Sequence, residues 1–406
     1  MKCGFYSILS FLILFLGILN SDTVFSQSAE ETSGDVLKDL QVNYGANGFE
    51  FRTNDNQYSL QIQSRLQFRY ATPGDQDPLS FNDFDDNSGN VFKVNRSRIK
   101  VGGHAYKSWL KYYWEYDLGQ SNLLDYRLMI EPWEFLNFKI GQFKVEYSRE
   151  RRISSGAQQT VDRSILNRAF TVDRQQGIEL YGRLRTVGAV DFNYWFGVFT
   201  GSGRGATEND NKDLMYFGRL QWNVFGENIG FTGSDLSIHE KPGAIIAVAG
   251  STNRSQHTRF SSSGGGFFEG YESENPGQYR LNQANIETAL VYQGFSWQSE
   301  IHWKKIEDRI NLRATNLSGY YLQAGYLAHQ SFSWWPKPLE IAARYASYTP
   351  NTRVKSNLDE LTLALNWFFK GHRNKLTMEI SEFDLETEDM GIKDELRFRI
   401  QWDISI

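Results

Sequence analysis

The chain has 406 residues, of which 22% are charged and 15% aromatic, and its formal net charge at pH 7 is −5. Beyond residue 20 no apolar run approaches 18 residues, which excludes a helical membrane protein. High aromatic content without long apolar runs is typical of strands that face water on one side and lipid on the other. The small net charge says little about partners, because external loops and an inner wall contribute to one sum.

The N-terminal segment predicts export from the cytoplasm. An apolar stretch over residues 5–19 follows a basic residue and is too short to span a membrane. Residues 24–26 resemble a cleavage site, so we expect residues 1–26 to form a signal peptide. The only cysteine, Cys3, lies within that peptide, so the mature chain would fold without disulfides.

A polar lead-in over residues 27–57 is expected to contain a small hairpin around residues 53–56. The next segment, residues 58–70, reads YSLQIQSRLQFRY, with apolar or neutral even positions and polar odd positions. Alternation of this length indicates a strand between two different environments, close to the length that crosses a bilayer when tilted. Its polar face carries Arg65 and Arg69.

The same alternation recurs along the rest of the chain, and the gaps between segments alternate between long and short. Long external loops and short periplasmic turns produce this asymmetry in bacterial barrels, which also have even strand numbers. We therefore predict an all-β fold, a transmembrane antiparallel β-barrel of about 16 strands over residues 58–406; a soluble β-sandwich is the alternative. The predicted strands span residues 58–70, 92–105, 109–118, 123–131, 135–143, 176–184, 189–199, 213–224, 243–251, 283–292, 295–305, 319–327, 338–348, 359–369, 374–383 and 395–406.

Three predicted strands would lie side by side, because the last strand closes the barrel against the first. An arginine facing lipid costs about 2–4 kcal/mol at the bilayer midplane, so their polar faces are expected to line the lumen. Acidic residues on other strands dilute this basic stripe. The basic residues that share the lumenal face of the three strands are Arg65, Arg69, Arg96, Arg98, Lys100, Arg397 and Arg399.

The third external gap, residues 144–175, carries a second basic group together with apolar residues that need something to pack on. We expect this loop to fold into the barrel lumen; the alternative is an outer loop whose arginines bind lipopolysaccharide phosphates. The fork of an arginine guanidinium matches the oxygens of phosphate and carboxylate groups. The loop arginines proposed to bind anions are Arg149, Arg151, Arg152 and Arg163.

Seven segments spread over most of the mature sequence point to one known family. They are NRSRIKVGGHAYKSWLKYYWEYDL, IGQFKVEYSRERRISSGAQQTVDRS, GIELYGRL, FNYWFGVFTGSG, YFGRLQWNVFG, ELTLALNWFFKGHRNKLTMEI and LRFRIQWDI. In these segments the sequence resembles the phosphate-selective porin O and P family, most specifically in the one that leads into the third loop. The resemblance implies a trimeric sixteen-stranded outer-membrane porin whose wall and third loop guide phosphate or other anions.

Other motifs do not point to an enzyme. The glycine-rich residues 201–205 are not followed by a helical pattern, and the acidic residues 82–87 lack the glycine of a calcium loop. The six histidines are scattered without metal-ligand spacing. We therefore predict no catalytic residue, no metal site and no cofactor.

The predicted function is a passive, anion-preferring diffusion channel in the outer membrane of a Gram-negative bacterium, with phosphate or polyphosphate as candidate solutes. Expected partners are small anions, outer-membrane lipid and lipopolysaccharide, and two further copies in a homotrimer; no nucleic acid is expected. Two alternatives remain: a general or sugar-permeable porin with weak charge selectivity, and a structural barrel or adhesin.

Overall fold

The computed structural model describes residues 40–45, 47–76, 78, 81–84, 89–186, 190–261, 264–268, 270–271, 275–349, 356–388 and 391–406. The predicted signal peptide, residues 1–26, lies outside the described residues. Among the described residues, no helix has the length and apolarity that crossing a membrane requires.

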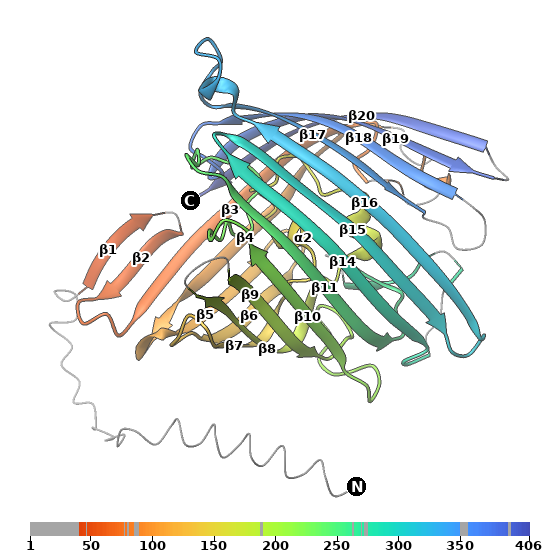
Figure 1. Cartoon of the computed structure of the whole chain (residues 1–406), viewed down its shortest axis with the longest axis horizontal. Coiled ribbons are helices and arrows are strands. Elements are labelled where there is room, and N and C mark those ends of the chain that lie inside the picture. The colour runs from red at the N-terminus through yellow and green to blue at the C-terminus, as the bar shows by residue number, and fades with distance from the viewer. Residues whose placement is uncertain are drawn as a thin grey trace, which may run out of the picture. The chain divides into compact units, whose positions relative to one another are not determined.

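Sixteen antiparallel strands follow one another around a closed barrel (Figure 1), and pairing of the last strand with the first completes it. All the strands predicted from the alternation are present, with boundaries that differ by a few residues. They are β3 (Ser59–Thr72), β4 (Val91–Ala105), β5 (Lys107–Asp117), β6 (Asn122–Ile130), β7 (Asn137–Lys144), β8 (Arg174–Arg185), β9 (Asp191–Phe199), β10 (Met215–Asn223), β11 (Gly243–Ser255), β14 (Tyr279–Tyr292), β15 (Phe295–Asp308), β16 (Arg313–Tyr326), β17 (Leu339–Tyr348), β18 (Ser356–Phe368), β19 (Asn374–Thr387) and β20 (Gly391–Ser405).

Among the described residues, four shorter strands and four short helices lie outside this set. Strands β1 (Leu40–Gly45) and β2 (Gly48–Thr53) pair with each other, and β2 also pairs with the start of β3 across a turn at residues 54–58. A small separate ribbon forms from β12 (Arg259–Ser261) and β13 (Gly264–Gly266). The helices are η2 (Phe81–Phe84), α2 (Arg149–Arg152), α3 (Leu166–Phe170) and η3 (Ala328–Gln330).

Each barrel strand has one polar face and one apolar face. In β3, Arg65 and Arg69 are 4% and 1% exposed, whereas Leu60 and Ile62 on the other face are 37% and 40% exposed. Exposed apolar residues recur on the same outward face of the remaining strands. Such a band suits contact with lipid, while the inward face holds the charged side chains.

Connection lengths differ between the two ends of the barrel. At one end β14 and β15 are joined by only Gln293 and Gly294, whose φ angles of 49° and 82° are those of a tight hairpin turn. At the other end β7 and β8 are separated by residues 145–173, and β11 and β14 by residues 256–278. We call the end with the long connections the external end, following the rule for bacterial barrels.

A β-bulge changes the face on which part of β4 lies. Gln67 pairs with Arg96, but the neighbouring residue Phe68 pairs with Val94, so one extra residue is inserted in β4. Arg69 consequently pairs with Lys93. Strict alternation from Arg96 would place Lys93 on the lipid face, whereas the bulge brings it to the face of Arg69.

Residues 145–173, which join β7 to β8 and contain α2 and α3, are almost entirely buried. The apolar residues Ile165, Leu166 and Phe170 belong to one cluster with inward-facing aromatic residues of the wall, including Tyr321 and Phe383. The sequence indicated that these side chains need a packing partner, and the barrel strands supply it.

Candidate functional site

Three glutamates of the wall hold the segment 145–173 in place. The Glu300 carboxylate on β15 accepts hydrogen bonds from the backbone N–H of Glu150 at 2.7 Å and from Ser148 Oγ at 3.2 Å. Glu360 on β18 accepts a hydrogen bond from the backbone N–H of Ile165 at 2.9 Å. Glu379 on β19 accepts one from the backbone N–H of Val161 at 2.6 Å. Glu300, one of the acidic residues predicted to dilute the basic stripe, therefore satisfies the backbone of this segment together with Glu360 and Glu379.

The four predicted arginines of this segment also make structural contacts. Arg163 donates to the carbonyls of Glu150 and Ile153, at 2.9 and 2.7 Å, and so closes the C-terminal end of α2. Arg149 donates to two backbone carbonyls in the connection between β10 and β11. Arg151 pairs with Asp173 at 2.5 Å, and Arg152 pairs with Glu146 at 3.2 Å.

Several wall cations of the predicted stripe are paired with carboxylates. Arg65 lies 3.1 Å from Asp403, and Arg98 contacts Glu115 at 2.8 Å and Asp117 at 2.9 Å. Arg397 pairs with Glu395, and Lys100 donates to the Gln63 side chain at 3.1 Å. The stripe is therefore a network of ion pairs over much of its length, and not a row of unpaired charges.

Positive charge concentrates in one cavity of about 450 Å³ near the external end of β3 and β4, which we call the basic cavity. It is formed by the β3–β4 wall, the connection that follows β3, the segment 145–173 and β12. Six cationic and two acidic side chains line it, with amides and hydroxyls between them. The charged residues are Arg69, Lys93, Arg96, Arg163, Arg168, Arg259, Asp75 and Asp162.

Arg69 lies at the centre of these contacts. Its guanidinium is 3.0 Å from Asp75 and 2.5 Å from Asp162, and Gln401 of β20 accepts from its other nitrogens at 2.7 and 3.0 Å. Arg399 borders the same two carboxylates, at 3.8 Å from Asp75 and 4.0 Å from Asp162. At this point of the barrel, two acidic side chains therefore form ion pairs with a larger number of cationic side chains.

Asp162 is the more accessible of the two acids, with 27% of its side chain exposed against 7% for Asp75. Partial burial would raise the pKa of Asp162, but the nearby charges of Arg69, Arg96 and Arg399 outweigh it and lower that pKa below its ordinary value. Asp162 is therefore ionised at neutral pH, and the cavity keeps a surplus of positive charge around it.

The basic cavity has the volume and the cationic lining to hold an oxyanion. An arginine contact to an anion at 4 Å is worth about 4 kcal/mol at an effective dielectric near 20, before competition from the two aspartates. Amide and hydroxyl groups of Asn95, Gln120 and Ser164 supply further hydrogen-bonding groups. In the ranges that the structure describes, His, Cys, Asp and Glu side chains form no group of three that could hold a metal ion.

The cavity includes residues that sequence reasoning did not select. Lys93 was missed because the β4 bulge reverses its face. Arg168 lies in the predicted basic loop, five positions after Arg163, but nothing in the pattern distinguished it from the other loop arginines. Arg259 comes from the connection between β11 and β14, and no periodicity in a loop of this kind predicts which wall it meets.

A closed antiparallel barrel with an apolar outer band and a charged inner face defines a protein of the outer-membrane β-barrel class. The sequence profile of the phosphate-selective porin O and P family matches residues 62–390, and the chain belongs to this family. It is a channel-forming porin of the Gram-negative outer membrane.

Solved structures share the fold at low sequence identity. An anion-selective porin from Comamonas acidovorans is 12% identical, with a TM-score of 0.52 over 86% of this chain and 99% of that one. The outer-membrane channel DcaP of Acinetobacter baumannii is 9% identical, with a TM-score of 0.56 over 88% and 99%. OmpT of Vibrio cholerae is also 9% identical, with a TM-score of 0.52 over 86% and 98%. No curated protein matches the chain.

Proposed function

We propose that this porin is a passive channel that prefers small anions of the phosphate type and selects them at the basic cavity. The observation that carries the proposal is the surplus of cationic over acidic side chains around that cavity. The name of the family and the anion selectivity of the Comamonas acidovorans porin support the same direction.

We infer that the segment 145–173 narrows the lumen beside this cavity. Its hydrogen bonds run to inward-facing residues of widely separated strands, from Glu300 on β15 to Arg65 and Arg69 on β3. A segment tied to several walls would force a passing solute along the side where the cations gather. These inward contacts favour this position over the alternative, an outer loop whose arginines bind lipopolysaccharide phosphates.

The proposed path uses several moderate contacts. An entering anion meets Lys93, whose side chain is 41% exposed, and then Arg96, which is 15% exposed. Asp75 and Asp162 compete with the anion for the same cations, so no single position becomes a deep trap. Conduction requires this balance between binding and release.

The variant Lys93→Gln plus Arg96→Gln tests the cavity directly. Removing two accessible cations should shift the zero-current potential in a KCl gradient across a planar bilayer toward cation preference, because less positive charge remains at the narrow point. The matched control is Lys241→Gln plus Lys370→Gln, which removes the same charge from exposed positions at the opposite end of the strands. Equal potentials for both variants would show that the cavity does not select ions.

A general porin with weak charge selectivity is the second candidate. The pairing of wall cations with carboxylates, as in Arg65 with Asp403 and Arg98 with Glu115, favours it. Phosphate should block chloride current if the main proposal is correct, whereas oligosaccharides and not phosphate should block it in a general porin. Homotrimer formation, implied by the family resemblance, is part of the proposal and is tested by native mass measurement.

A further inference from the structure

The outward face of β10, β11, β14, β15 and β16 changes character toward the external end. One row of hydrogen-bonded neighbours is apolar and exposed. Two rows nearer the external end, residues in register are polar or charged. The apolar row is Leu220, Val248, Ile286, Ile301 and Tyr320, and the polar row is Tyr216, Thr252, Asn282, Lys305 and Asn316.

A basic hollow of about 320 Å³ lies on this outer face, and four cations line it together with a single acid, Asp213. Arg254 forms an ion pair with Asp213 at 2.6 Å. Within the described residues, the other three cations form no ion pair of 4 Å or less. Glu307, which pairs with Lys305 at 2.6 Å, lies opposite Arg280 in register and interacts electrostatically with Arg280 and Arg309. The cations are Lys212, Arg254, Arg280 and Arg309.

Arg254 and Arg280 oppose each other directly across β11 and β14. Like charges at such positions are destabilising, since their Cβ atoms lie only about 4.5–5.5 Å apart. An anion seated between their guanidinium groups would relieve this repulsion. This cross-strand pair therefore places two of the four cations of the hollow next to each other, where one anion can contact both.

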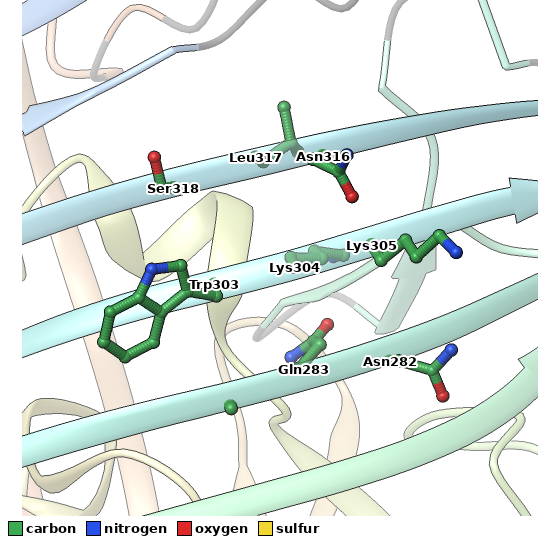
Figure 2. Close-up of a pocket in the computed structure, with 9 residues that line it drawn as sticks. Asn282, Gln283, Trp303, Lys304, Lys305, Asn316, Leu317 and Ser318 are labelled. Atoms are coloured by element: carbon green, nitrogen blue, oxygen red, sulfur yellow. The ribbon is translucent and has the colours of Figure 1, made fainter.

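A second hollow of about 430 Å³ adjoins the first across β14, β15 and β16. Figure 2 shows Trp303, Lys305 and Asn316 on the near side of the strands, whereas Lys304 lies behind the ribbon. The exposed side of this hollow combines an indole with amide and hydroxyl groups and one ammonium group. Register places Asn282, Lys305 and Asn316 side by side, and Trp303 beside Ser318.

We propose that the two hollows form one binding site for a phosphate-bearing, acylated glycolipid of the outer leaflet. The arginines would take the phosphate, because their planar forks match its oxygens. Asn282, Asn316 and Ser318 would hydrogen-bond the sugar hydroxyls and amides. Trp303 lies where the polar rows meet the apolar band, as interfacial aromatic residues do, and would contact the start of the acyl chains.

The position of the site indicates that its ligand is a membrane lipid and not a solute of the lumen. Both hollows lie on the outward face, just beyond the apolar row, so a solute in the lumen cannot reach them. At this depth a membrane offers lipid headgroups, and cations near an anionic headgroup layer are attracted to it. The site is independent of the anion selectivity proposed for the lumen.

Native mass spectrometry of the detergent-solubilised wild-type protein, titrated with purified lipid A, tests the proposal. The variant Arg280→Gln plus Arg309→Gln should lower the apparent affinity for lipid A by about tenfold or more. Lipid A from which the phosphates have been removed should bind the wild type as weakly as intact lipid A binds the variant. Lys241→Gln plus Lys370→Gln, with the same loss of charge at the opposite strand ends, should bind like the wild type.

Three results would overturn the proposal. The first is equal affinity of the wild type and the Arg280/Arg309 variant for lipid A, with both retaining the heat-modifiable mobility of a folded barrel. The second is inorganic phosphate that binds as tightly as lipid A and loses this affinity in the Arg280/Arg309 variant, which would identify the outer hollow as a site for a free anion. The third is loss of the oligomer in the variant without lipid, which would identify the face as a contact between copies of the chain. The titration with dephosphorylated lipid A uses only the wild-type protein, and its result alone shows whether the phosphates contribute to binding.

Discussion

Asp162 and Asp75 set how much positive charge the basic cavity offers to a solute. Each carboxylate contacts more than one cation: Arg69 contacts both, Lys93 contacts Asp75 at 2.5 Å, and Arg96 lies 3.9 Å from Asp162. In the proposed function, an entering anion would compete with the partly exposed Asp162 carboxylate for the same guanidinium groups. Single charges at this position should therefore decide selectivity more than the total charge of the wall.

Asp162→Asn should increase anion preference. The amide is nearly the same size, but the change removes one negative charge that lies within about 4 Å of Arg69, Arg96 and Arg399. We expect a larger zero-current potential in the anion direction and stronger phosphate block of chloride current, both reduced at high salt. Glu134→Gln, at an exposed pair with Arg185 between β6 and β7, is the control and should behave as the wild type. An unchanged or reversed shift in Asp162→Asn would contradict the proposed role.

Among the secondary-structure elements, the segment 145–173 depends on the wall for its backbone partners. α2 has only four residues and α3 five, too short to be stable alone. Their position is set by wall carboxylates and by packing of Ile165 and Phe170 against the inner aromatic cluster. The barrel wall therefore determines the conformation of the segment. We expect each hydrogen bond between the wall and the segment to stabilise that conformation separately.

Glu379→Ala should loosen this segment. The change leaves the buried N–H of Val161 without its acceptor, which costs roughly 1–3 kcal/mol. Trypsin should then cleave faster at the arginines of residues 145–173, with fragments identified by mass. Glu382→Ala is the matched control, since Glu382 lies on the same strand but on its exposed face. Equal cleavage rates in the two variants would mean that Glu379 does not anchor the segment.

Alternation predicted the strands of the barrel and their faces, because a side chain's face depends only on position parity in a regular strand. In β3 this placed Arg65 and Arg69 correctly on the inner face. It did not place Lys93, since the bulge in β4 is a backbone event without a sequence signal. The contribution of Arg259 depends on the path of a long connection, which is set by tertiary packing and not by local pattern.

Across the complete barrel, the seam between the first and last strands supports both fold and site. β20 pairs with β3 from Phe398 opposite Thr72 to Ser405 opposite Arg65, so no strand edge is left open there. The same seam carries the Arg65–Asp403 ion pair and the hydrogen bonds from Arg69 to Gln401. The strand pairing that closes the barrel therefore also positions Arg69, the central cation of the basic cavity.

Anion preference is the property on which the proposed function depends. It is measured most simply as the zero-current potential of the wild-type channel in a planar bilayer with a KCl gradient. We expect a potential of the sign that chloride-selective permeation gives, and its reduction when phosphate occupies the channel. A potential of the opposite sign, showing cation preference, would contradict the proposed function.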